Sequence, residues 1–243
     1  MSGHSKWSHI KRKKELKDKA KGSLFSKLSR AIILSVIEGG GVTDPGNNLR
    51  LRLAIDKAKE LNMPKGNIDR AIAKGTGPNR EMIREVIFEA FAPFGVTIII
   101  LAATDNVNRT LGLVKHTLDQ HHAKLGTPGS VSYLFTKCGL MTFAKSKVPE
   151  EQIFLLAEKF GAFDIDTDKF FYYAYIPFDH LGKIKHQEEK IPYENFDIDY
   201  KPHSLITIPK QEDAHKLLDL IEALEELDDV QKVFANFDIS YEV

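Results

Sequence analysis

The chain has 243 residues, of which 42% are hydrophobic and 28% charged, as in a folded globular protein and unlike a disordered or membrane-spanning chain. This length predicts two or three domains. The longest apolar run, residues 96–103, is far shorter than the roughly 20 residues that cross a bilayer, and we see no signal-peptide core, so we expect a cytoplasmic protein. The single cysteine, Cys138, suits a reducing compartment, and we interpret it as a small buried side chain.

The formal net charge of zero conceals a strong segregation of charge along the chain. Residues 1–75 contain 17 Lys and Arg against 7 Asp and Glu, a net charge of +10 that the remaining residues balance with −10. Within residues 1–30 there are ten basic residues and two acidic ones. Such segregation predicts a polyanion-binding arm joined to an acidic body.

The arm, residues 5–21, has too few apolar side chains to bury one face of a helix, so we expect it to order fully only on a partner. Its Lys and Arg residues can neutralise phosphates, and Trp7 can stack on an exposed base. The alternative is a solvated basic helix with Trp7 packed on the body. The predicted nucleic-acid contacts are Lys6, Trp7, Lys11, Arg12, Lys13, Lys14, Lys17, Lys21, Lys27 and Arg30.

After the arm, apolar residues at helical spacing predict a small helical bundle. Its helices run from Leu24 to the glycines at 39–41, from Leu49 to Leu61, and from Pro64 to Gly75. A linker rich in Gly and Pro follows at residues 75–79.

Beyond the linker, the apolar pattern alternates between strands and helices and predicts an α+β body. The uninterrupted aliphatic run at 96–103 favours a strand covered on both faces. The other strands are expected at 86–90, 131–135, 140–143, 164–166, 170–176, 196–208 and 230–239, and the helices at 109–121, 150–160, 180–190 and 212–227.

Motifs for catalysis and metal binding are incomplete. The glycines at 39–41 end a helix and lack the Gly-Lys-Ser/Thr of a phosphate loop. Asp164, Asp166 and Asp168 have the opening spacing of a calcium loop, but Lys169 stands where glycine is required. The histidines between 116 and 122 lack the four-residue spacing of a zinc pair, and no nucleophile elbow is present. We therefore predict no metal, no cofactor and no enzymatic activity.

A series of short motifs connects the sequence to a known family. They are Gly3-His4-Ser5-Lys6-Trp7, Gly39-Gly40-Gly41, Asn62-Met63-Pro64-Lys65, Arg70-Ala71-Ile72, Thr104-Asp105-Asn106, Asn108-Arg109-Thr110, Leu125-Gly126, Gly129-Ser130-Val131 and Leu227-Asp228-Asp229-Val230-Gln231. With these motifs the chain resembles the YebC/PmpR family over its whole length. A mitochondrial relative of that family is the translational activator of cytochrome c oxidase.

The resemblance implies an α+β multidomain fold: an N-terminal helical bundle followed by two α+β domains, the third inserted into the second. On this basis we predict a basic helical domain at residues 1–76. A second domain combines residues 80–136 and 206–243, and residues 137–205 form an inserted, ferredoxin-like domain.

The resemblance also implies two functions. The first is DNA-binding transcriptional regulation. The second is a ribosome-associated translation factor that binds ribosomal RNA and assists the synthesis of proline-rich sequences. No helix-turn-helix, zinc-finger or ribbon motif is evident, so the sequence predicts no element that would contact base edges in the major groove. We place transcription first and translation as a close alternative. A third reading is a protein-interaction module in which the acidic body binds the partner.

Three segments depart from the family pattern, one of which is residues 120–124, where the usual Gly-Gly is missing. Residues 90–95 read Ala-Phe-Ala-Pro-Phe-Gly where relatives have a glycine-rich turn, and Val107 replaces an expected arginine. The missing positive charge weakens the prediction that Asn106, Asn108 and Arg109 form a secondary nucleic-acid contact. The alternative is that Asp105 or Asn106 caps the helix that follows.

Overall fold

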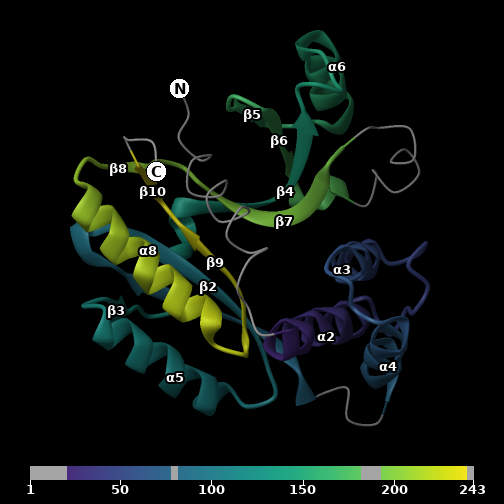
Figure 1. Ribbon diagram of the computed structural model, residues 1–243, viewed down its shortest axis with the longest axis horizontal. Helices are drawn as coiled ribbons and strands as arrows, with labels where there is room; N and C mark the ends of the chain where they lie inside the picture. Colours follow the sequence, from purple (N-terminus) through teal and green to yellow (C-terminus); the bar gives the residue numbers. More distant parts are fainter. Residues whose placement is uncertain (1–20, 78–81, 182–192, 240–243) are drawn as a thin grey trace.

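The computed structural model describes residues 21–77, 82–181 and 193–239, with side chains from residue 24 onward. It has the expected α+β multidomain fold. A helical bundle precedes a sheet-containing unit, and a second sheet-containing unit is inserted into the first (Figure 1). The exact domain boundaries stay a prediction.

The bundle consists of α2 (Lys21–Glu38), α3 (Leu49–Glu60) and α4 (Lys65–Thr76). Gly40 and Gly41 follow α2 with φ angles of +68° and +85°, which favour glycine, so the chain turns there. The predicted end of α4 at Gly75 was wrong by one residue. Gly75 lies inside the helix, where a Cβ atom would come within 2.6 Å of Val36, so glycine allows α4 to approach α2. The buried core comprises Leu28, Ile32, Ile33, Val36, Leu51, Ile55, Ala58, Met63, Ile68 and Ala71.

The first sheet contains β1 (Arg84–Phe91), β2 (Thr97–Thr104), β3 (Lys124–Leu125) and β9 (Val230–Ala235). They are antiparallel in the order β3-β1-β2-β9. One face is covered by α5 (Val107–Gln120) and α8 (Gln211–Glu226), whose apolar faces share a core with the strands (Figure 1). β2 is central and buried on both faces, which confirms the prediction from its aliphatic run.

The second sheet contains β4 (Phe135–Ala144), β5 (Asp164–Thr167), β6 (Phe171–Pro177) and β7 (Asn195–Pro202). Their order is β5-β6-β4-β7, all antiparallel. The apolar face of α6 (Glu150–Phe160) packs on this sheet through Ile153 and Phe160. The helix predicted at 180–190 falls mostly outside the described residues, so the ferredoxin-like label stays a prediction.

The chain makes the second sheet between β3 and α8, and then returns to the first sheet. β9 pairs with β2 from Ile98↔Ala235 to Ala102↔Val230. The short parallel strands β8 (Ile206–Ile208) and β10 (Phe237–Ile239) lie beside this return. The second sheet is therefore an insertion.

The prediction of a strand at residues 131–135 was wrong. Residues Ser132–Leu134 form a 3-10 turn, and β4 is one longer strand that starts at Phe135. The buried carboxylate of Glu89 accepts hydrogen bonds from the backbone N–H groups of Gly129 (2.7 Å), Val131 and Ser132 (2.9 Å). These amides are therefore unavailable for a strand ladder. Although burial raises the pKa of Glu89, the hydrogen bonds outweigh it and hold this pKa below its usual value.

Candidate nucleic-acid interface

Most of the predicted arm contacts fall outside the described residues. These are Lys6, Trp7, Lys11, Arg12, Lys13, Lys14 and Lys17. Lys21 is the first residue of α2. Of the predicted set, the structure describes the side chains of Lys27 and Arg30 only.

Lys27 and Arg30 extend from α2 toward the body rather than into solvent. The Lys27 ammonium donates to the backbone carbonyl of Glu225, at the end of α8, and to that of Val230 at 2.9 Å. The Arg30 guanidinium donates to the carbonyl of Asp228 at 2.6 Å and pairs with the Asp229 carboxylate at 3.1 Å. Both cations therefore hold α2 against the turn between α8 and β9.

The predicted secondary contacts lie at the start of α5. Asn106 is the N-cap, and its side-chain oxygen accepts the backbone N–H of Arg109 at 3.1 Å, which confirms the capping alternative. The helix starts at Val107, two residues earlier than predicted. The Arg109 side chain pairs with Asp105 (2.8 Å) and with Asp229 (2.9 Å). Asn108 is exposed on the first turn.

Asp229 joins these separate segments. Its carboxylate is only 4% exposed and lies between Arg30 of α2 and Arg109 of α5. The hydroxyls of Thr104 and Thr110 also donate to it, at 3.1 and 2.6 Å. Burial alone would raise the pKa of Asp229, but the hydrogen bonds from Arg109, Thr110 and Thr104 and the charge of Arg30 lower it below its usual value. Three of the motifs behind the family resemblance thus meet in one charged cluster: those that contain Thr104, Arg109 and Asp229.

The bundle touches the body at a second point, where all three units meet. Arg50 of α3 pairs with Glu38 of α2 and, at 2.8 Å, with Glu85 of β1. Lys137 of β4 lies 3.8 Å from Glu85, with its ammonium over the ring of Phe178. Burial lowers the pKa of Lys137. The apolar side chains of Leu49 and Leu53 in α3 pack on the core of the inserted unit. Charge and apolar contact therefore both fix the bundle to the body.

A different set of cations on the bundle is exposed. Lys65, Arg70 and Lys74 lie on α4, which forms the outer side of the bundle in Figure 1. Arg70 donates to the Gly66 carbonyl at 3.0 Å and to the Asn67 side chain within its own helix. These residues were not among the predicted contacts. The signal that could have found them is the charge of residues 21–77, which contain ten Lys and Arg but only five Asp and Glu.

The described residues also bear on metal binding and membrane spanning. In the part of the chain that the structure describes, His, Cys, Asp and Glu nowhere gather in a group of three suited to a metal ion. None of its described helices combines the length and the apolar character needed to span a membrane.

Fold and contacts together define a three-part α+β protein whose basic helical bundle is tied to an acidic body by shared carboxylates. The profile of the TACO1/YebC N-terminal domain matches residues 5–78, and that of the TACO1/YebC second and third domains matches residues 83–237. The chain belongs to the TACO1/YebC family.

Relatives and a solved structure agree with this assignment. Proteins named "probable transcriptional regulatory protein" from Aquifex aeolicus and Persephonella marina are 44% and 42% identical over the whole chain and 98% of their own length. The crystal structure of a conserved hypothetical protein from Aquifex aeolicus is 41% identical, with a TM-score of 0.81 over 93% of both chains.

Proposed function

We propose that this protein is a non-enzymatic, nucleic-acid-binding regulator that acts in transcription, the role that the names of its relatives give to them. The observation that carries the proposal is the division of the bundle's cations. Lys27, Arg30 and Arg50 are engaged with the body, whereas the α4 cations are exposed. In this proposal the exposed set and the basic segment at residues 6–21 both meet phosphates.

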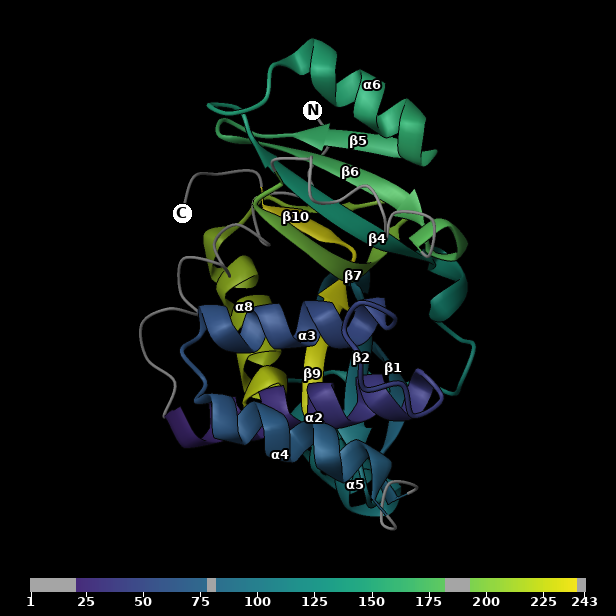
Figure 2. The same ribbon diagram turned by 90° about the vertical axis from the view of Figure 1, so that its right-hand side faces the viewer.

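The arrangement of the bundle favours contact with the sugar-phosphate backbone. A helix-turn-helix sets its second helix steeply across the first, so that it can enter the major groove. In Figure 2, α2, α3 and α4 instead run alongside one another. Contacts to phosphate position a protein without identifying bases. We therefore expect affinity that depends weakly on sequence.

The same observation supports a second candidate, binding to ribosomal RNA by a ribosome-associated translation factor. Double-stranded RNA is recognised mostly through its shape, phosphates and 2′-hydroxyls, which needs no base-reading helix. A surface of exposed Lys and Arg is as suitable for this target as for DNA.

The surface is tested by charge-neutralising triple variants of equal size. One carries Lys11→Gln, Lys13→Gln and Lys14→Gln, and another Lys65→Gln, Arg70→Gln and Lys74→Gln. The matched control neutralises exposed lysines of the body: Lys115, Lys124 and Lys216. Fluorescence anisotropy on two unrelated DNA duplexes and an RNA hairpin should show weaker binding for the first two variants. A loss only in the body control would contradict the proposal.

Sedimentation separates the two candidates. Cell extract is run on a sucrose gradient, with the body control variant in parallel. Co-migration with ribosomal subunits, abolished by the triple variant at residues 11–14, would favour the translation factor. Sedimentation away from ribosomes, together with retention on chromosomal DNA, supports transcription.

A further inference from the structure

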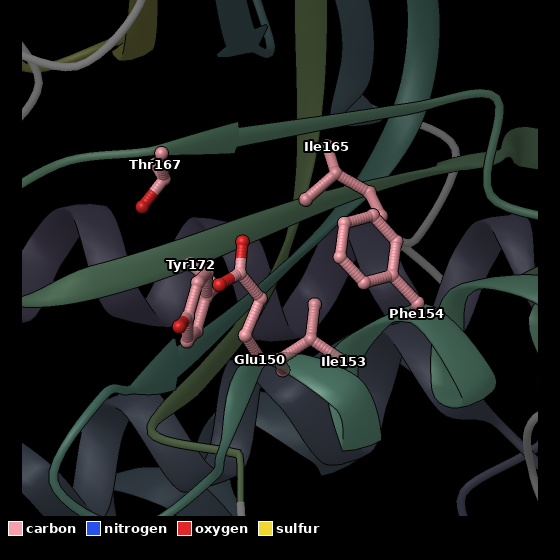
Figure 3. A pocket seen from close by; sticks show the side chains of 6 residues that line it. All are labelled: Glu150, Ile153, Phe154, Ile165, Thr167 and Tyr172. Atoms are coloured by element: carbon pink, nitrogen blue, oxygen red, sulfur yellow. The ribbon is translucent and has the colours of Figure 1, made fainter.

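The inserted unit has an open groove between α6 and the strand β5. Ile153 and Phe154 of α6 form one wall, Ile165 and Thr167 of β5 the other, and Tyr172 of β6 the floor (Figure 3). The groove measures about 100 Å³. A cavity of roughly 150 Å³ can hold benzene, so this space suits one branched aliphatic side chain.

The groove lies beside a strand edge that carries outward-facing backbone groups. β5 is the outermost strand in the order β5-β6-β4-β7. The N–H of Asp168 donates to the Phe171 carbonyl at 3.0 Å, so in an antiparallel pair the alternate residues Ile165 and Thr167 direct their backbone groups away from β6. The Ile165 N–H donates to the Asp164 carboxylate at 2.9 Å, so an added strand would pair with the Ile165 carbonyl and with the N–H and carbonyl of Thr167. Edge strands of this kind accept an added strand.

The inserted unit exposes large aromatic side chains. Phe154 is 57% exposed, although its ring borders the groove. Phe170, in the turn between β5 and β6, is 59% exposed. An added strand would cover the first ring and fill the groove at the same time, which supplies the apolar burial that backbone hydrogen bonds alone do not.

The charge at the mouth of the groove selects the partner. Glu150 lines the groove and Glu151 follows it on the first turn of α6; neither carboxylate forms an ion pair within the described residues. They are complementary to Lys or Arg beside the inserted side chain. A second copy of this chain fits poorly, because its β5 reads Asp-Ile-Asp-Thr and offers no basic side chain to meet Glu150.

We propose that this edge binds an extended segment of a partner protein, in which one aliphatic side chain enters the groove and a basic residue two positions away meets Glu150. The added strand pairs with β5 through its backbone. This docking surface is separate from the basic bundle, so a partner can bind here while the bundle contacts nucleic acid.

The test uses the full chain and a labelled peptide, Thr-Lys-Thr-Ile-Thr-Lys-Thr, in fluorescence polarisation. Phe154→Ala should weaken binding by about tenfold, as expected for an anchor residue. Its neighbour Leu155, 67% exposed and outside the groove, supplies the matched control, and Leu155→Ala should change the affinity less than about twofold. Glu150→Gln should weaken the Lys peptide but not one with Thr in place of both lysines.

N-methylation of the peptide tests strand addition directly. Methyl groups on one alternate set of amides should abolish binding, while those on the other set are tolerated, since only one set faces β5. No binding at up to about 1 mM, or equal losses for Phe154→Ala and Leu155→Ala, would overturn the proposal. Tighter binding of a peptide of residues 5–21 to the same groove, or dimerisation sensitive to Phe154→Ala, would also overturn it, by assigning the groove to this chain itself.

Discussion

Two sets of cations on the same helical bundle differ in what they contact. Lys27, Arg30 and Arg50 reach carbonyl or carboxylate oxygens of the body, several at 2.6–3.1 Å. The α4 cations are exposed. The net charge of a segment therefore overstates the charge available to a polyanion, because part of it is neutralised inside the fold. Substitutions in the inward set should change stability, and those in the outward set should change binding.

The largest effect on stability is expected at the carboxylate shared by the two arginines. Asp229→Ala should lower the free energy of unfolding by about 2 kcal/mol, since it removes a buried carboxylate that binds two partly exposed arginines and accepts from the buried hydroxyls of Thr104 and Thr110. Urea denaturation measures this, and hydrogen exchange should show faster opening of α2. Asp219→Ala, at an exposed position of α8, is the control. A loss below about 1 kcal/mol would show that the cluster does not hold the bundle.

Acid should weaken the contacts of Asp229 and also those of Glu89 with residues 129–132. The pKa values of Asp229 and Glu89 are lowered in the fold from ordinary values of 3.8 and 4.5. Their stabilisation is therefore complete above these ordinary values and is lost as pH falls through the lower folded values. The free energy of unfolding should decrease from about pH 5 downward. Asp229→Asn should flatten this dependence; an unchanged pH profile would exclude Asp229 as a source.

A smaller effect is expected at the turn after β1, away from both sets of cations. Phe94 has φ of +65°, a region that favours glycine, and its ring is 46% exposed. Phe94→Gly should raise the free energy of unfolding by up to about 1 kcal/mol. Phe94→Ala keeps the unfavourable conformation and should bring no gain. Equal effects of the two substitutions in thermal unfolding would contradict this explanation.

The smallest effect on stability is expected for the outward set. Replacing Lys65, Arg70 and Lys74 with Gln should change the free energy of unfolding by no more than about 0.5 kcal/mol, because exposed charges contribute little. Urea denaturation of this variant beside the wild type provides the measurement. A large loss of stability would mean that α4 charges also support the fold.

Sequence patterns predicted those helices and strands whose bounds are set by residues close to them in the chain. α6 was predicted at its observed bounds, and the structure shows that these bounds have local causes: Pro149 precedes the helix and Gly161 ends it in a left-handed conformation. The strand predicted at 131–135 failed because its amides are bound by Glu89, some 40 residues away. Likewise, no local pattern shows that Arg30 meets Asp229, since they lie far apart in sequence. The role of residues 6–21 stays a prediction.

The salt dependence of nucleic-acid affinity tests the central claim most directly. If about five to seven cations meet phosphates, log affinity for duplex DNA should fall against log salt with a slope of roughly −4 to −6. The triple variant at residues 11, 13 and 14 should flatten this slope by about 2 to 3 units, whereas the control variant at Lys115, Lys124 and Lys216 should leave it unchanged. Identical slopes for the wild type and the triple arm variant would contradict the assignment of the basic segment as the contact surface.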